Sequence, residues 1–179
     1  MQPRIPRQSA GEQGDRRPDA AGDAPRSGAE LASVVSGARR RAVRDGDRQV
    51  DTAHLLHSLL ELDPEARAVL GEGPQLARLF GYLVQRSIGY GLRWQSTVED
   101  SGAVPVMSGV AGFSPLAAAA MADARARAAR RGAAEAGGVD LLAALVADPQ
   151  ARAVEVLGRA AVDPRTVLAR ARNLSGPMP

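Results

Sequence analysis

DTAHLLHSLLELDPEARAV, at residues 51–69, contains two consecutive helix signals. In its first part, apolar residues recur at the spacing of one helical face instead of alternating as they do in a strand. Asp51 or Thr52 supplies the N-cap, because a short oxygen-bearing side chain there accepts a backbone N–H. Asp63 followed by Pro64 marks a second helix start, since proline fits the first helical position. The apolar stripe consists of Leu55, Leu56, Leu59 and Leu60.

The same pattern returns in the second half of the chain. GGVDLLAALVADPQARAV, at residues 137–154, repeats the leucine stripe and the DPxARAV phrase 85 or 86 positions later. Further outward, LASVVSGARRRAVRDG at 31–46 matches AAAAMADARARAARRG at 117–132. Both segments end at a glycine, which is favoured just past helix ends. We therefore predict an all-α fold, a pseudo-twofold duplicated four-helix repeat that makes an eight-helix bundle.

Three more proline pairs predict helix starts in the second half. They are Ser114–Pro115, Asp148–Pro149 and Asp163–Pro164. On this basis we expect one helical domain at residues 29–175, with repeat one at 29–87 and repeat two at 113–175. A Gly-rich connector at 88–112 joins them, and a connector of this length is uncommon unless it is functional or mobile.

Residues 1–28 differ from the rest of the chain. They are rich in Gly, Pro, Arg and Asp and nearly free of large apolar side chains. Such a segment cannot bury enough surface to offset the entropy of ordering, so we expect a disordered tail.

Composition narrows the location and the partners. The chain has no Cys, which excludes disulfides and thiol chemistry. No apolar run approaches the roughly 18 residues that span a bilayer, and no signal peptide is recognisable, so we expect a soluble, cytoplasmic protein without a membrane partner. The net charge is only +3, and acids are scattered among the arginines. Nucleic-acid binding is therefore not favoured.

The ordered duplication resembles the Clp N-terminal (Clp R) domain. Each half carries a leucine-rich second helix, T-x-H-L-L-x-x-L-L at residues 52–60 and the related GVDLLAALV at 138–146, and the second half opens on FSPLA at residues 113–117. In that family the domain precedes the AAA+ unfoldases of Clp proteases and disaggregases. The resemblance covers residues 29–173, and the chain has no G-x-x-x-x-G-K-[ST] phosphate loop. It implies a stand-alone recognition domain without its motor.

The resemblance also implies a ligand groove between the two repeats. Phe113 matches the family's aromatic residue at the border of that groove, and Ser114 follows it. Family members that bind phosphoarginine commonly carry a Glu after the Thr of each second helix. Here the corresponding positions are Ala53 and Val139, so phosphoarginine recognition of that kind is not expected.

The sequence contains no convincing catalytic or metal motif. His54 and His57 lie three residues apart on one expected helix, but a zinc site needs three or four ligands. We interpret His54 as a packing or capping residue. The carboxylate pairs Glu61 with Asp63 and Glu99 with Asp100 lack a nearby nucleophile motif such as G-x-S-x-G, and we interpret them as solvated charge. We predict no enzyme, no cofactor and no metal.

Trp94 is the candidate partner-binding aromatic of the connector, because tryptophan is a favoured interface anchor. The alternative is that Trp94 and Tyr90 pin the connector to the bundle, while Phe80 and Tyr82 belong to the core. The Arg-rich stretches at 38–48 and 124–132 are interpreted as charged outer faces of helices. Alternatively, they meet an acidic partner or a phosphate backbone.

The expected function is that of a non-enzymatic binding module of the Clp proteolysis system. It would act as an adaptor or a decoy that binds peptide segments or cyclic peptide antibiotics at Phe113, Ser114 and Trp94. Its expected partners are a Clp AAA+ unfoldase or that unfoldase's substrates and adaptors. Two alternatives remain: a small-molecule or antibiotic-sequestering protein independent of Clp, and an Arg-rich nucleic-acid-associated regulator.

Overall fold

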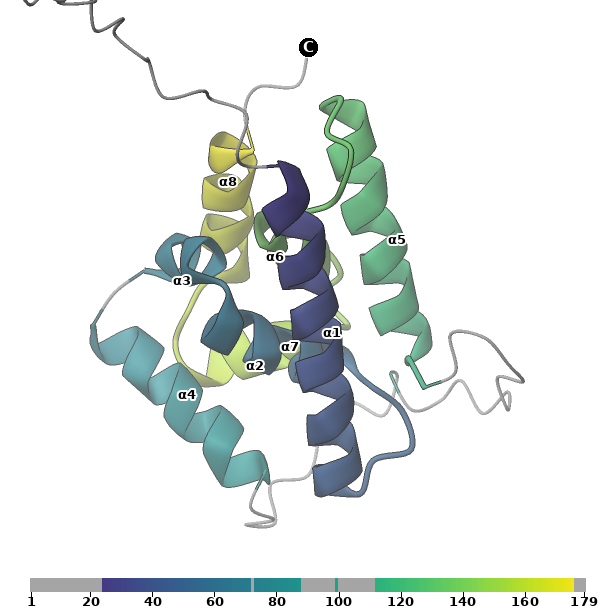
Figure 1. Cartoon of the computed structure of the whole chain (residues 1–179). Helices are drawn as coiled ribbons and strands as arrows, with labels where there is room; N and C mark the ends of the chain where they lie inside the picture. The colour runs from purple at the N-terminus through teal and green to yellow at the C-terminus, as the bar shows by residue number, and fades with distance from the viewer. Residues whose placement is uncertain (1–23, 72, 88–98, 100–111, 176–179) are drawn as a thin grey trace, which may run out of the picture.

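The computed structural model describes residues 24–71, 73–87, 99 and 112–175 (Figure 1). Over these residues the structure is all-α, as predicted, and its β pairing is limited to an isolated bridge between Val50 and Phe113. The described helices are α1 (Ala24–Asp45), α2 (Thr52–Leu62), α3 (Pro64–Leu70), α4 (Pro74–Ser87), α5 (Pro115–Arg130), α6 (Gly138–Leu145), α7 (Arg152–Arg159) and α8 (Pro164–Leu174).

Helix α2 lies at the centre of the core. All of its residues from Thr52 to Leu60 are buried, and the leucine stripe predicted from the sequence is fully shielded from solvent. Its counterpart α6 is buried in the same way and contributes Leu141, Leu142 and Leu145. Burying one such side chain contributes about 1.5–3 kcal/mol, so these two helices supply much of the driving force for folding.

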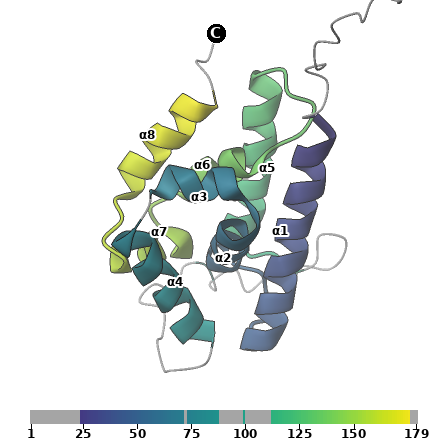
Figure 2. The same ribbon diagram turned by 60° about the vertical axis from the view of Figure 1, so that its left-hand side comes forward.

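The remaining helices pack around this pair in matching contacts. Helix α1 packs on α2, and α5 packs on α6. The contact of α2 with α7 is matched by that of α6 with α3. The contact of α4 with α7 is matched by that of α8 with α3. Exchanging α1–α4 with α5–α8 converts each of these contacts into its partner. The contacts fit a duplicated repeat, and the duplication itself stays a prediction. Figures 1 and 2 both show α1 and α5 alongside each other.

Most of the predicted caps are confirmed. Asp51, Asp63, Ser114 and Asp163 each accept a backbone N–H at the start of α2, α3, α5 and α8, respectively. Proline occupies the first turn of α3, α5 and α8, where it lacks only an N–H that would be unpaired anyway.

The prediction that Asp148–Pro149 begins a helix is wrong. These residues form a turn, in which Asp148 Oδ1 accepts the Gln150 N–H at 2.8 Å and the Asp148 carbonyl accepts the Ala151 N–H at 3.1 Å. Helix α7 starts at Arg152, because its first amides are bound by side chains from elsewhere. The Arg152 N–H donates to Glu99 Oε2 at 3.0 Å, and the Ala153 N–H donates to Thr52 Oγ1 at 3.0 Å.

The domain boundaries differ in one place from those expected. Helix α1 begins at Ala24, inside the segment 1–28 that was predicted to be a tail, and Pro25 at its start suits a first helical turn. Residues 1–23 and most of the connector, including Tyr90 and Trp94, lie outside the described residues. Within the described part of the chain, no helix combines the length and the apolar character that a membrane span requires.

Candidate functional site

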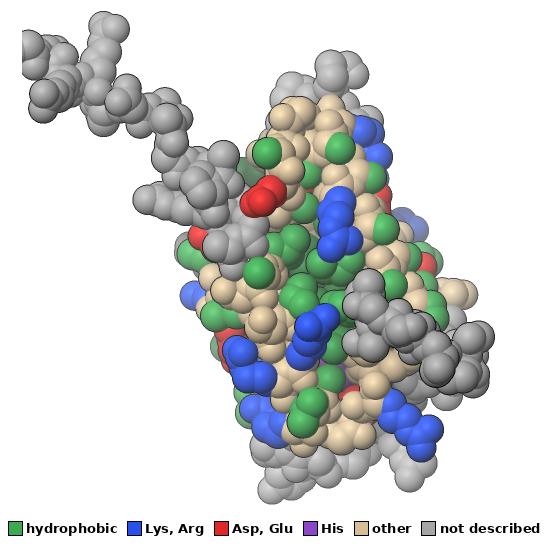
Figure 3. All heavy atoms as spheres, turned by 45° about the vertical axis from the view of Figure 1, so that its right-hand side comes forward, with side chains coloured by type: hydrophobic (Ala, Val, Ile, Leu, Met, Phe, Trp, Pro, Cys, Tyr) green, Lys and Arg blue, Asp and Glu red, His purple; other side chains and the backbone are tan. Residues whose placement is uncertain are grey.

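A groove lies between Leu31 of α1 on one side and the second half of α5, with the segment that follows it, on the other. It encloses about 310 Å³, and its walls are mainly alanines with one arginine and one glutamate. Figure 3 shows hydrophobic side chains in a hollow on this side of the molecule, with arginines around it. The groove can accommodate an extended apolar segment with an acidic group. It is lined by Leu31, Arg125, Ala128, Ala129, Ala133, Ala134, Glu135 and Ala136.

Phe113 and Ser114 lie at the start of α5 but do not line this groove. The Phe113 side chain is only 6% exposed, and the Arg39 guanidinium of α1 lies 5.6 Å from its ring centroid. The backbone beside Phe113 is fixed by a bridge in which the Ser114 N–H donates to the Val50 carbonyl at 2.9 Å. Phe113 therefore connects the start of α5 with α1. Its role in binding a partner stays a prediction, as does that of Trp94.

The most elaborate polar arrangement is centred on Glu99. Its side chain is 1% exposed, and each carboxylate oxygen accepts two hydrogen bonds. Oε1 accepts from the Thr52 N–H at 2.6 Å and from Ser114 Oγ at 2.7 Å. Oε2 accepts from Thr52 Oγ1 at 2.9 Å and from the Arg152 N–H at 3.0 Å. We call Thr52, Ser114 and Arg152 the carboxylate cradle.

The interpretation of Glu99 and Asp63 as solvated charge was wrong, since both side chains are buried. Asp63 caps α3, which the DP signal indicated. Glu99 could not be recognised, because its donors come from residues 47, 15 and 53 positions away in the chain. Asp100 lies outside the described residues.

A buried ion pair adjoins the cradle. Arg152 Nη1 lies 2.7 Å from Asp51 Oδ2, and both side chains are at most 3% exposed. Burial alone would raise the pKa of Asp51, but hydrogen bonds and charge from His54, together with Arg152, lower it to about 2. Asp51 thus joins the start of α2 to the start of α7.

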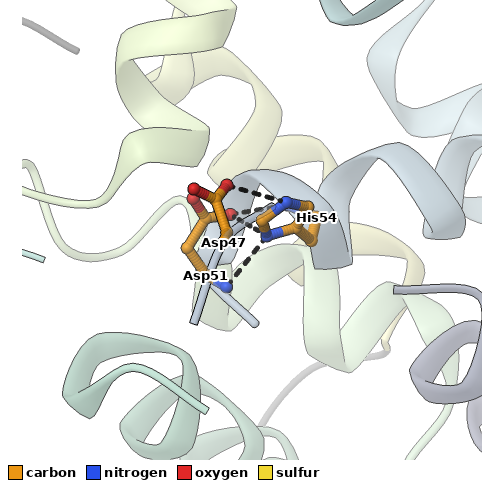
Figure 4. Close-up of side chains that lie close together, drawn as sticks. All are labelled: Asp47, Asp51 and His54. Atoms are coloured by element: carbon orange, nitrogen blue, oxygen red, sulfur yellow. Dashed lines mark hydrogen bonds and ion pairs between the residues drawn. The ribbon is translucent and has the colours of Figure 1, made fainter. Parts of the chain in front are cut away.

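His54 stands at the centre of an acidic cluster (Figure 4). Its Nδ1 lies 2.8 Å from Asp51 Oδ1, and its Nε2 lies 3.3 Å from Asp47 and 3.5 Å from Asp45 carboxylate oxygens. Burial alone would lower the pKa of His54, but Asp47 and Asp51 raise it to about 9. A protonated ring donates from Nδ1 to Asp51, whereas a neutral ring would accept the Asp51 N–H, which lies 3.1 Å away. The three acids favour the protonated ring.

Asp47, Asp51 and His54 are the described residues whose ligand atoms lie close enough together to hold a metal ion. However, Asp51 already binds the His54 N–H and the Arg152 guanidinium. A divalent cation there would lie beside a buried positive charge. The cluster is explained without a metal, because Asp51 caps α2 and His54 is ion-paired with Asp47 and Asp51.

The second half contains a charge-inverted counterpart of this pair. Arg131 forms a two-pronged ion pair with Asp140, with Nη2 at 2.8 Å from Oδ2. Arg131 lies 86 positions after Asp45, and Asp140 lies 86 positions after His54; His54 and Asp140 are each the third residue of a helix, α2 and α6. The acid and the base have exchanged places, which preserves the attraction. This supports an ion-pair role for His54.

His57 has a different environment on the same helix. Its ring packs edge-on against Phe80, with the centroids 6.5 Å apart, and its side chain is 5% exposed. Burial, helped by the charge of Arg41, lowers the pKa of His57 to about 4. His57 is therefore neutral at pH 7, and the two histidines do not form a paired ligand set.

No protein-family model matches this chain, and a comparison with characterised proteins found no significant match.

Proposed function

We propose that this protein is a non-enzymatic binding module of the Clp proteolysis system, which holds a peptide segment of an unfoldase's substrate or adaptor between α1 and α5. The observation that carries the proposal is the groove between these two helices. It borders the first helices of the two predicted repeats, as the groove implied by the resemblance to Clp N-terminal domains would, although Phe113 and Ser114 do not line it. Its alanines offer an apolar floor without bulky side chains.

The charges around the groove favour a particular kind of peptide. Arg125 lines the groove, and the exposed Arg39 and Arg130 belong to the two helices that flank it. Glu135 is the acid among the lining residues. An apolar segment with acidic residues on one side would bury its apolar side chains and pair with these arginines, since charge complementarity speeds encounter and sets orientation.

A degradation assay with purified Clp unfoldase, its protease and an unfolded substrate tests this function. Added full-length chain raises the degradation rate if it is an adaptor and lowers it if it is a decoy. The Ala129→Glu variant, with an acid in the groove, loses the effect, whereas Ala118→Glu, an exposed position of the same helix outside the lining, retains it. An unchanged rate at saturating chain concentration would overturn the proposal.

A further inference from the structure

The carboxylate cradle has the donor pattern of a binding site for a planar two-oxygen anion. Two donors converge on each oxygen of Glu99. Of these four donors, two are backbone amides and two are side-chain hydroxyls. Such hydrogen bonds to an ionised acceptor are roughly twice as strong as neutral ones. A buried carboxylate is costly unless it is fully hydrogen-bonded, and here four donors meet that requirement.

Each donor residue also makes contacts that do not involve Glu99. Thr52 and Arg152 begin α2 and α7, so the positive ends of both helix dipoles point at the carboxylate. Ser114 caps α5 by accepting the Ala117 N–H at 3.1 Å, and the Thr52 hydroxyl accepts the Ala153 N–H. Three helices that the packing already fixes therefore pre-organise the cradle.

A second cavity adjoins the cradle at Thr52. It encloses about 360 Å³ between α5 and the segment joining α6 to α7. Thr52 itself and Ala151, the residue before Arg152, line its inner part, and small apolar side chains line most of the rest. Its outer residues include the acids Asp123 and Asp148. The remaining lining residues are Leu116, Ala119, Ala120, Ala144, Leu145, Ala147 and Pro149.

We propose that the carboxylate cradle is a ligand site in which Glu99 is a built-in occupant, and that the C-terminal carboxylate of a partner peptide in the adjoining cavity replaces it. The alanine walls select small apolar residues at the end of this peptide. Asp123 and Asp148 select a basic residue further from its terminus. This site lies on the flank of α5 formed by Leu116, Ala119 and Ala120, whereas the groove to α1 uses Arg125, Ala128 and Ala129, so the inference does not depend on the proposed function.

Calorimetric titration of the full chain with two matched peptides tests the inference. Both peptides have a basic residue followed by three alanines, and one ends in a free carboxylate while the other ends in an amide. Glu99→Ala should bind the free acid about tenfold or more tightly than the wild type does, because an internal competitor lowers the binding-competent fraction. Glu135→Ala, which removes an exposed acid outside this cavity, controls for the change in net charge.

Three results would overturn the inference. Equal binding of acid and amide by Glu99→Ala would show that the cradle does not recognise a carboxylate. Equal affinity of the wild type and Glu99→Ala for the acid would show that Glu99 is not a competitor. A third peptide ends in an amide and carries its carboxylate only on an internal Glu. If it bound as tightly as the free acid, a C-terminal ligand would be excluded.

Loss of the fold in Glu99→Ala would not end the test. Refolding of this variant is then followed by circular dichroism with acetate or with acetamide. The inference predicts that acetate restores helicity at concentrations where acetamide does not, because acetate supplies the missing oxygens. Failure of both to restore helicity contradicts the inference.

Discussion

Arg152 and Asp51, which are 101 residues apart in the chain, meet in a buried ion pair with an N–O distance of 2.7 Å. The pair connects the first residue of α7 to the N-cap of α2 and lies beside the Glu99 carboxylate. It joins the two halves of the molecule at a point where three helices begin.

Removal of the Arg152 guanidinium should destabilise the protein strongly. Arg152→Leu leaves the Asp51 carboxylate buried without its guanidinium partner, which costs about 3–5 kcal/mol in the free energy of unfolding. The comparison variant is Arg159→Leu, whose pair with Glu155 is partly exposed and contributes at most about 1 kcal/mol. Urea denaturation measures both, and equal losses would contradict a structural role for the buried pair.

Gly138 should tolerate no side chain. A β-carbon there would lie 2.6 Å from Asp63 Cγ and 3.0 Å from Leu59 Cδ1, so the cap of α3 would have to move. Gly138→Ala should lose about 1–3 kcal/mol of stability, as overpacked sites do. Gly158→Ala, in open space within α7, should gain about 0.5–1 kcal/mol from the better helix propensity of alanine. A stable Gly138→Ala would refute the close approach of α3 and α6.

His57 should make the protein less stable in mild acid. Its pKa is about 4 in the folded state against 6.5 in the unfolded chain, so the unfolded state binds the proton first as the pH falls. Between pH 6.5 and 4 the stability should fall by at most about 1.4 kcal/mol per pH unit from this group. His57→Gln removes that part of the slope, and thermal unfolding at a series of pH values reveals it.

His54 should act in the opposite direction above neutral pH. Its folded-state pKa of about 9 exceeds the ordinary 6.5, so its stabilising charge is fully present below pH 6.5. This stabilisation is lost as the pH rises towards 9, with a slope of at most about 1.4 kcal/mol per pH unit. The difference in stability between wild type and His54→Gln should therefore shrink from pH 6.5 to 9. A constant difference would mean that His54 is neutral in the folded protein.

Local signals in the sequence account for most of the fold. The leucine stripes, the short oxygen-bearing caps and the prolines at first helical positions act within a few residues, and they correctly placed the starts of α2, α3, α5 and α8. The DPQARAV phrase gave a wrong start for α7, because the side chain that binds the first amide of a helix can come from a distant residue instead of from the local cap. Glu99 binds the first amide of α7, so that helix starts at Arg152 instead of Pro149.

The polar centre of the molecule depends on contacts that no local pattern encodes. Glu99, Thr52, Ser114 and Arg152 come from four separate segments, and only the folded chain brings them together. A Glu-Asp pair in a Gly-rich stretch looks like solvated charge. Asp45 and His54 correspond to Arg131 and Asp140 at an offset of 86 positions. This correspondence could have indicated an ion pair, since in each half one of the two positions holds an acid and the other a base.

Direct binding between the purified full chain and a purified Clp unfoldase tests the central claim most directly. Surface plasmon resonance should show saturable binding that Ala129→Glu abolishes and Ala118→Glu leaves unchanged, since only the first position lines the groove between α1 and α5. Circular dichroism confirms that both variants are folded. The account would be contradicted if the wild type showed no saturable binding to the unfoldase, either alone or loaded with an unfolded substrate. Equal binding by both variants would also contradict it.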